Sequence, residues 1–182
     1  MQEPRARLLH SVIAELDAHG LRDRSLRDIA QAVGTSHRML IHHFGSREGL
    51  LVAVVETVEA GERERAAEVG AAAPTDFDTA FRATWRHFAQ PRQAGRERLF
   101  FECYARALQG EEPFVRLLPD AVTTWVDMAA AGERARGASA AAARARARLY
   151  LALIRGLLLD LLATGDRRGT AAALDAFLAD RA

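Results

Sequence analysis

The stretch SLRDIAQAVGTSHRMLIHHFGSREGLL, residues 25–51, constrains the fold of this chain more than any other part of it. Ser25 and Asp28 have the spacing of a capping box, which predicts the start of one helix, and Gly34 predicts its end. Ser36 is the expected cap of the next helix. Two short helices joined by a turn of three or four residues that contains a glycine predict a helix-turn-helix.

The small residues of this stretch have steric reasons for their positions. Ala30 is expected where the two helices cross, because a larger side chain would hold them apart. Gly34, four residues later, is expected to supply the positive φ of the tight turn. Ile29, Val33 and Leu40 are then expected to close a small core.

The polar residues of the second short helix are expected to point outward. If Leu40 points inward, a rotation of about 100° per residue places Arg38 and His42 on the opposite side and Met39 and Ile41 on its flanks. An outward Arg side chain can donate to phosphates or bind guanine through two hydrogen bonds in a major groove that is about as wide as a helix. The pattern therefore predicts DNA recognition, with a solvated helix face as the plain alternative.

A zinc site is the other interpretation of the clustered histidines. Adjacent His42 and His43 diverge by about 100°, and His37 lies five residues before His42 rather than the four that would align them. No cysteine is near in the sequence. We therefore expect no metal and no cofactor.

The rest of the 182-residue chain predicts helices, because strand patterns are scarce and Ala, Leu, Arg and Glu dominate. We predict an all-α fold of about nine helices, with a break at residues 70–76. Pro119 is expected to kink or divide the seventh helix. The predicted helices span about 4–19, 25–33, 36–44, 46–68, 76–89, 93–109, 113–131, 139–164 and 170–180.

Composition excludes some classes of protein. The single cysteine, Cys103, cannot form an internal disulfide, and the first residues hold no apolar run of the signal-peptide type. The longest apolar tract, 149–163, is interrupted by Arg155 and Asp160 and is too short for a membrane span. We therefore expect a cytoplasmic protein. The net charge of +1 does not by itself indicate a nucleic-acid binder.

Residues 5–58 resemble the DNA-binding domain of the TetR family of bacterial transcriptional regulators. The resemblance rests on SLRDIAQAVGTS, on the following LIHHF, and on SREGLL, which opens the fourth predicted helix. The length and helix order of the whole chain also agree with the family. The resemblance implies an N-terminal three-helix helix-turn-helix domain at 1–50 and an effector-binding and dimerisation domain at 51–182.

The resemblance also implies a function. TetR-like proteins are typically repressors that bind a palindromic operator in double-stranded DNA as homodimers and are released by a small-molecule effector. By resemblance, the positions that contact DNA are Ser25, Arg27, Thr35, His37, Arg38, Met39, Ile41, His42, His43 and Arg47. Family members often have a small residue and Thr where this chain has Arg38 and Met39, and Tyr in place of Ile41, so the operator should differ. Because histidines gain a proton near neutral pH, operator affinity should rise as the pH falls from about 8 to 6.

The effector site is expected, by resemblance, among the large apolar side chains of residues 76–131, although such side chains also form ordinary core. Aromatic rings with a polar tip and flexible methionines suit a largely apolar ligand. The candidates are Trp85, Phe88, Phe101, Tyr104, Trp125 and Met128. Glu102 and Arg106, one helical turn apart, are expected to pair with each other. Cys103 is either inert packing or a redox sensor.

The helix at 149–163 is apolar nearly all round, so we expect one face inside the subunit and another against a second copy. With the last helix, this pattern matches the family's four-helix dimer interface. The predicted interface residues are Leu153, Gly156, Leu157, Leu161, Leu174, Phe177 and Leu178. A monomer whose core these helices complete is the alternative.

Other classes of function fit less well. The chain offers no nucleophile beside a base, no paired carboxylates on a shared face and no phosphate-binding glycine loop, so we expect no enzyme. A dimeric helical adaptor or ligand-binding protein with a weakened DNA-binding fold is the remaining alternative, because Arg38, Met39 and Ile41 depart from the family pattern.

Overall fold

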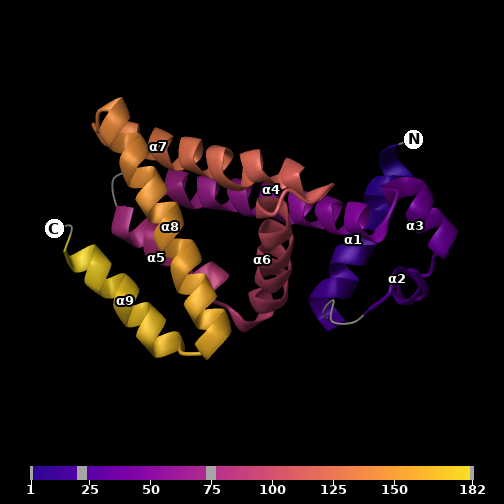
Figure 1. Cartoon of the computed structure of the whole chain (residues 1–182). Helices are drawn as coiled ribbons and strands as arrows, with labels where there is room; N and C mark the ends of the chain where they lie inside the picture. The colour runs from indigo at the N-terminus through magenta and orange to yellow at the C-terminus, as the bar shows by residue number, and fades with distance from the viewer. Residues whose placement is uncertain (1, 20–23, 73–76, 181–182) are drawn as a thin grey trace. The chain divides into compact units, whose positions relative to one another are not determined.

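The computed structural model describes residues 2–19, 24–72 and 77–180, and these residues form helices joined by turns, without a strand among them (Figure 1). The predicted all-α fold is confirmed. The α-helices within these ranges are α1 (Gln2–His19), α2 (Leu26–Ala32), α3 (His37–Phe44), α4 (Arg47–Ala72), α5 (Phe77–Phe88), α6 (Ala94–Leu108), α7 (Trp125–Ala135), α8 (Ala140–Thr164) and α9 (Arg167–Ala179).

The chain divides into two compact units. Unit 1 consists of Met1–Ala60 and Gly95–Leu118, and unit 2 of Gly61–Ala94 and Pro119–Ala182. Helix α4 therefore contributes its first half to unit 1 and its second half to unit 2. The predicted boundary at residue 50 separates a DNA-binding from an effector-binding domain by function, whereas these two units are separated by their packing. The predicted boundary therefore stays a prediction.

The core of unit 1 follows the apolar spacing of its helices. Leu9, Val12 and Leu16 recur at intervals of three and four in α1 and are all buried. Residues 50–55 of α4 are all buried too, because α4 has neighbours on every side at this point. Cys103 of α6 is fully buried in the same unit.

Unit 2 contains two helical hairpins (Figure 1). In the first, Ala143 and Ala147 of α8 pack against Val126 and Ala130 of α7, where small side chains let the two helices approach closely. In the second, α8 ends at Thr164 with Gly165 as its C-cap, and α9 follows directly, capped by Asp166, whose carboxylate accepts from the Gly169 N–H at 2.8 Å. The two hairpins share α8.

The helix predicted at 113–131 is the main difference from the sequence-based expectation. A 3₁₀ turn (Phe114–Leu117) and a π-helical turn (Asp120–Thr124) precede α7, which ends at Ala135. The reason is Pro119, which has no N–H to donate and so interrupts the α-helical hydrogen bonds, as predicted. Another 3₁₀ turn (Pro91–Gln93) separates α5 from α6.

Two other boundaries shift by a few residues. Helix α4 continues to Ala72 instead of ending near residue 68, and α9 begins at Arg167 instead of 170. Of the predicted break at 70–76, the first three residues are helical and residues 73–76 lie outside the described ranges. Among the helices described, none is long and apolar enough to cross a membrane.

Candidate nucleic-acid interface

The turn between α2 and α3 has the predicted geometry. Gly34 has φ +70°, in the left-handed region that favours glycine. Ala30 is 2% exposed, and its carbonyl accepts from the Thr35 N–H at 2.9 Å. Ile29 and Leu40 are fully buried, as predicted, whereas Val33 is only half-buried.

Side-chain caps fix the beginning of both short helices. The Asp28 N–H donates to Ser25 Oγ at 3.2 Å, and the Ser25 N–H and hydroxyl donate to Asp28 Oδ2 at 2.8 and 2.7 Å. The hydrogen bond from the Ser25 hydroxyl lowers the pKa of the Asp28 carboxyl. At α3, Ser36 Oγ accepts from the Met39 N–H at 3.2 Å. Both predicted caps are therefore confirmed.

The outward face of α3 carries most of the predicted DNA-contacting residues. His37, Arg38 and His42 are exposed, whereas Leu40 and Phe44 anchor the opposite face of the helix in the core. The two apolar members of the predicted set are also in solvent, with Met39 41% and Ile41 37% exposed. His43 is half-buried at the edge of this face.

The remaining predicted contacts lie at helix beginnings and in the turn. Arg27 on α2 is exposed, while Thr35 in the turn and Arg47 at the start of α4 are half-buried. Ser25 is exposed as well, but its hydroxyl proton is already donated to Asp28. A phosphate contact by Ser25 would therefore compete with the cap of α2.

Two residues that the sequence interpretation missed help to position α3. Arg5 of α1 donates from Nε to the His43 carbonyl at 3.3 Å, and its guanidinium lies 5.0 Å from the centre of the Phe44 ring. Gly49 of α4 lies so close to the end of α3 that a Cβ there would be 2.1 Å from the Phe44 carbonyl oxygen. Gly49 is part of the SREG motif, but its close approach to α3 depends on how α3 and α4 pack, which the sequence of the motif does not predict.

Comparison with known proteins identifies this domain. Residues 8–54, which include α2, α3 and the start of α4, match the model of bacterial regulatory proteins of the tetR family. This segment is therefore similar to the DNA-binding domain of the TetR family. Its helix-turn-helix is thus a DNA-binding domain of the type that the sequence predicted.

Solved structures extend the likeness to the whole chain. A TetR-family transcriptional regulator from Pectobacterium atrosepticum matches with a TM-score of 0.75 and 23% identity, covering 98% of this chain and 91% of that one. A putative TetR-family regulator from Rhodococcus sp. matches with 0.70 and 21%, covering 97% of each chain. Thermus thermophilus FadR, a TetR-family repressor in complex with lauroyl-CoA, matches with 0.67 and 19%, covering 96% and 91%. No curated protein matches the sequence. The whole chain has the fold of TetR-family transcriptional regulators.

The predicted effector residues of this TetR fold are divided between the two units. Trp85 and Phe88 of α5 are buried in unit 2, where the Phe88 ring meets Trp125 edge to face with centroids 6.2 Å apart. Met128, one turn after Trp125 on α7, is half-buried. The last two candidates, Phe101 and Tyr104, are half-buried on α6 in unit 1.

A buried polar cluster in unit 2 was not predicted. The Glu62 carboxylate on α4 lies 2.6 Å from His87 Nε2 on α5, and the Gln93 side-chain amide donates to Glu62 at 3.3 Å. Glu62 and Gln93 are 6% and 4% exposed. Buried polar groups need such partners, so the cluster holds α4 and α5 in a defined register. The three residues are too far apart in sequence for any spacing rule to join them.

The expected pairing of Glu102 with Arg106 is wrong. Arg106 instead donates from Nε to Glu111 at 2.8 Å and from Nη2 to the other oxygen of that carboxylate. The turn after α6 brings Glu111 within hydrogen-bond distance of the guanidinium, whose Cζ lies 4.0 Å from the centre of the Phe114 ring. The hydrogen bond from Arg106 lowers the pKa of Glu111.

The environment of Cys103 bears on its possible redox role. Its side chain is fully buried in unit 1. Burial is the main cause that raises the pKa of the thiol to about 12, and the nearby Glu102 adds to it. Because the thiolate is the reactive species, burial and the raised pKa favour a packing role for Cys103 over a redox role.

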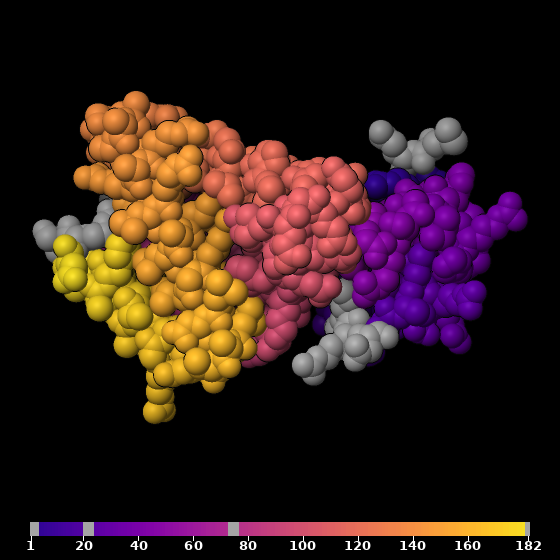
Figure 2. Space-filling model, viewed as in Figure 1, coloured from indigo at the N-terminus to yellow at the C-terminus, as the bar shows by residue number. Residues whose placement is uncertain are grey.

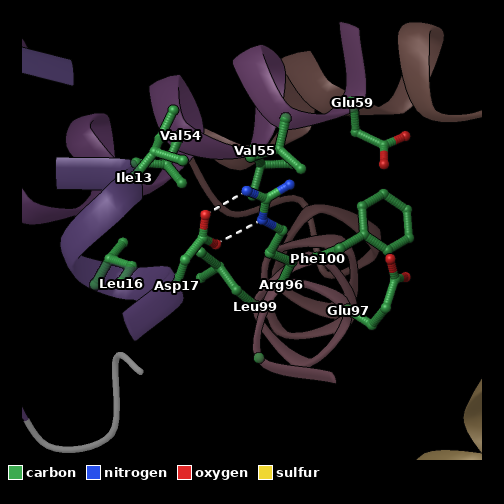
Figure 3. Close-up of a pocket in the computed structure, with 12 residues that line it drawn as sticks. Ile13, Leu16, Asp17, Val54, Val55, Glu59, Arg96, Glu97, Leu99 and Phe100 are labelled. Atoms are coloured by element: carbon green, nitrogen blue, oxygen red, sulfur yellow. Dashed lines mark hydrogen bonds and ion pairs between the residues drawn. The ribbon is translucent and has the colours of Figure 1, made fainter. Parts of the chain in front are cut away.

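A pocket in unit 1 lies among α1, α4 and α6 (Figure 3). Arg96 of α6 donates to both carboxylate oxygens of Asp17 on α1, the Nε contact being 2.5 Å, and Glu59 and Glu97 lie on either side of the Phe100 ring. The cavity measures about 30 Å³. That is room for about one water molecule and far below the roughly 300 Å³ of a small-ligand site. None of the six predicted effector residues lines it.

The predicted dimer residues do not all face outward. Leu157, Leu161, Leu174 and Leu178 are buried by their own subunit, Leu153 and Phe177 are half-buried, and Gly156 is exposed. The exposed face of α8 is instead an outer stripe that recurs at intervals of three and four residues: Ala141, Ala145, Leu149, Ala152, Gly156, Leu159 and Ala163. Leu149 and Leu159 are 54% and 50% exposed. Figure 2 shows α8 and α9, in orange and yellow, at the surface of unit 2.

Proposed function

We propose that this protein is a transcriptional regulator that binds a palindromic operator as a homodimer through α3 of each subunit. The observation that carries the proposal is the outward face of α3, where Arg38 and His42 are exposed on a helix whose Leu40 and Phe44 are fixed in the core. Rigid placement matters because a bidentate contact to guanine needs a defined guanidinium position. A reading helix held at both ends meets this need.

The phosphate contacts of the proposed interface surround this reading helix. Arg27 lies in the first turn of α2, and His37 and Arg47 are the first residues of α3 and α4, so all three can anchor the domain on the DNA backbone. Thr35 and His43 complete the edge of the surface. Ile41 replaces the aromatic hydroxyl common in the family, so backbone anchoring depends more on these basic groups.

Dimerisation is proposed through the outer stripe of α8 together with α9. Gly156 lies in the middle of the stripe, and a Cβ at this position would meet no atom of its own subunit within 4 Å. The exposed side of α9 is also small, with Gly169, Ala172, Ala176 and Ala179 at intervals of three and four. Small residues let helices approach closely, and a two-fold dimer presents two reading helices to a palindrome.

The proposed effector is a small, largely apolar molecule bound among residues 76–131, the sensing part of the fold. We propose that effector binding lowers the affinity for DNA and so relieves repression. The lauroyl-CoA complex of the FadR neighbour shows that a protein of this fold accepts an acyl chain. Trp85, Phe88, Trp125 and Met128 of unit 2 and Phe101 and Tyr104 of α6 are the proposed contacts. The chain has two tryptophans and both are in this set, so quenching of tryptophan fluorescence by candidate ligands tests it directly.

The Asp17–Arg96 ion pair is proposed to couple the sensing part to the reading helix. It joins α1, which packs on α2, to the beginning of α6 across 79 residues of sequence. Both side chains are about one third exposed, at 30% and 31%, so the pair contributes little to stability and can be broken without unfolding. An effector that favours the conformation without this pair would lower DNA affinity.

The experiment that tests the function is selection of bound duplexes from a random DNA pool with the purified protein. A palindromic motif whose preferred base is lost in Arg38→Ala, but kept in Arg134→Ala on α7, supports the regulator. Arg134 is an exposed arginine of unit 2 and serves as the matched control. Binding that shows no motif and no preference over bulk DNA would instead favour the helical adaptor with a weakened DNA-binding fold.

A further inference from the structure

Helix α3 exposes two large apolar side chains beside its basic ones. Met39 is 41% and Ile41 37% exposed, on a helix of only eight residues. Removing apolar surface from water is favourable, so a surface that leaves part of both side chains in water gains from a partner that covers them. Neither residue belongs to the hydrophobic core of unit 1.

The arrangement of these side chains around α3 identifies the kind of partner. At about 100° per residue, Arg38 and His42 lie about 40° apart at the centre of the outward face. Ile41 lies about 60° to one side of Arg38, and Met39 about 60° to the other side of His42. The face therefore has a basic, hydrogen-bonding centre with one apolar side chain on each flank.

This arrangement fits the major groove better than a protein surface. A protein-docking helix places its apolar residues at the centre and its charges at the rim, which is the reverse of α3. In the major groove, guanine offers two acceptors to an arginine, and the methyl group at C5 of thymine is the apolar feature that distinguishes one base from another. Helix α3 itself carries no carboxylate that would repel the DNA.

We propose that Met39 and Ile41 determine operator specificity by packing on the C5-methyl groups of thymines on either side of the base pair read by Arg38. This inference rests on the proposed DNA-binding function and names the bases that the same surface selects. The half-site then contains a guanine with a thymine on each side of it, within one or two base pairs of the guanine. Each thymine can belong to either DNA strand. Apolar contacts supply part of the specificity that a Thr or Tyr side chain would supply through hydrogen bonds.

The two side chains differ in how strictly they select. Ile41 is branched at Cβ and has one strongly preferred χ1 rotamer in a helix, so its methyl groups have a fixed position. Met39 has three rotatable bonds and a polarisable sulfur, which adapts to a methyl group at more than one place. We therefore expect a sharper thymine requirement at the base contacted by Ile41 than at the base contacted by Met39.

The test replaces single thymines of the selected operator by deoxyuridine, which removes the C5-methyl group and keeps every hydrogen bond. Fluorescence anisotropy at constant salt then gives the dissociation constant for the full-length protein. For the unsubstituted protein, loss of a contacted methyl group should weaken binding about fourfold, the value of one buried methyl-sized group. Met39→Ala and Ile41→Ala should each remove this penalty at one thymine and keep it at the other.

The controls separate this inference from the function on which it rests. Leu108→Ala changes a 64% exposed apolar residue of α6 and should keep both penalties. All three variants alter exposed side chains, so thermal unfolding should stay close to that of the unsubstituted protein. A motif that depends on Arg38 but tolerates deoxyuridine within twofold at every position would overturn the role of Met39 and Ile41 and leave the regulator intact. A half-site without thymine near the guanine would do the same, whereas the absence of any motif would overturn both.

Discussion

Helices α3 and α8 both place apolar side chains in solvent, but they surround them differently. On α3, Met39 and Ile41 flank a basic centre, whereas on α8 the outer stripe has alanines, leucines and Gly156 at its centre and charged residues at its edges. The exposed apolar area alone does not distinguish a DNA-binding face from a subunit interface. The arrangement of polar and apolar groups across the helix distinguishes the two. The major groove of DNA offers hydrogen-bond acceptors with isolated methyl groups, whereas a second subunit offers a continuous apolar surface.

The largest expected effect concerns the basic centre of α3. Arg38→Ala should weaken operator binding by roughly 5- to 150-fold, the value of a bidentate contact to guanine, and relax the sequence preference at one base pair. Binding assays on the selected operator and on single-base variants measure both effects. The operator affinity of Arg134→Ala should stay within twofold of that of the unsubstituted protein. An equal loss of affinity in both arginine variants would mean that Arg38 contributes only its positive charge and no specific contact.

The next effect concerns the centre of the outer stripe. Gly156→Leu should weaken dimerisation about tenfold or more, because the added side chain has room in its own subunit but would obstruct a closely packed partner helix. Sedimentation equilibrium gives the dimer dissociation constant. Gly61→Leu adds the same side chain at another exposed helical glycine with no atom within 4 Å of its Cβ and should leave the dimer intact. An unchanged dimer dissociation constant in Gly156→Leu would show that the interface does not include the outer stripe.

The same two regions respond oppositely to a single methyl group. Gly49→Ala should destabilise the fold by roughly 1–3 kcal/mol, because its Cβ would be 2.1 Å from the Phe44 carbonyl oxygen and the end of α3 must shift. Gly156→Ala should stabilise an isolated subunit by up to about 1 kcal/mol, since alanine is the better helix former. Urea unfolding of both variants at low protein concentration measures the difference. Equal effects would mean that the close approach at Gly49 is relieved at little cost.

A smaller effect distinguishes the caps of the two helices. Ser36→Ala and Ser139→Ala each remove an N-cap hydroxyl and should each cost about 1 kcal/mol in urea unfolding. Only Ser36→Ala should also weaken operator binding, because the eight-residue α3 has few other hydrogen bonds to hold its first turn. Loss of operator affinity in Ser139→Ala would show that the cap of α8 acts on DNA binding through the dimer.

The smallest expected effect is the pH dependence of the α2 cap. The pKa of Asp28 is lowered in the folded state by its hydrogen bonds to Ser25, so the cap stabilises the fold above the unfolded-state value of about 4. This contribution is lost as the pH falls through the lower folded-state pKa. The free energy of unfolding of Asp28→Asn should therefore decline less steeply below pH 4 than that of the unsubstituted protein. Parallel curves would show that other acids, such as Glu15 and Glu111, whose pKa values are also lowered, dominate.

The helix-turn-helix was predictable because its determinants are local. The Ser25 and Ser36 caps, the Gly34 turn and the inward position of Leu40 all depend on residues within about four positions, which is the range of helical geometry. The assignment of outward residues on α3 follows from the same geometry. The resemblance to the TetR family rests on these local features, and the match at residues 8–54 confirms it.

The rest of the candidate sites depends on contacts that no local rule predicts. Arg106 has a carboxylate one turn before it at Glu102, yet it binds Glu111 after the chain has turned. The cluster of Glu62, His87 and Gln93 joins residues 25 and 31 positions apart. A helix that is apolar nearly all round also gives no sign of which side its own subunit covers. The sequence alone therefore does not separate the buried Leu157 and Leu161 of α8 from the exposed Leu149 and Leu159.

The buried thiol described in unit 1 has a practical consequence. Cys103 is the single cysteine of the chain, and with a pKa of about 12 it is almost entirely protonated at neutral pH. Maleimide reagents should therefore not react with Cys103 but should modify any cysteine introduced at an exposed position. Cys103 need not be replaced before such labelling. Spin labels at His37→Cys or Ala152→Cys would then report the spacing of paired reading helices, or of paired stripes, by pulsed spectroscopy with and without operator.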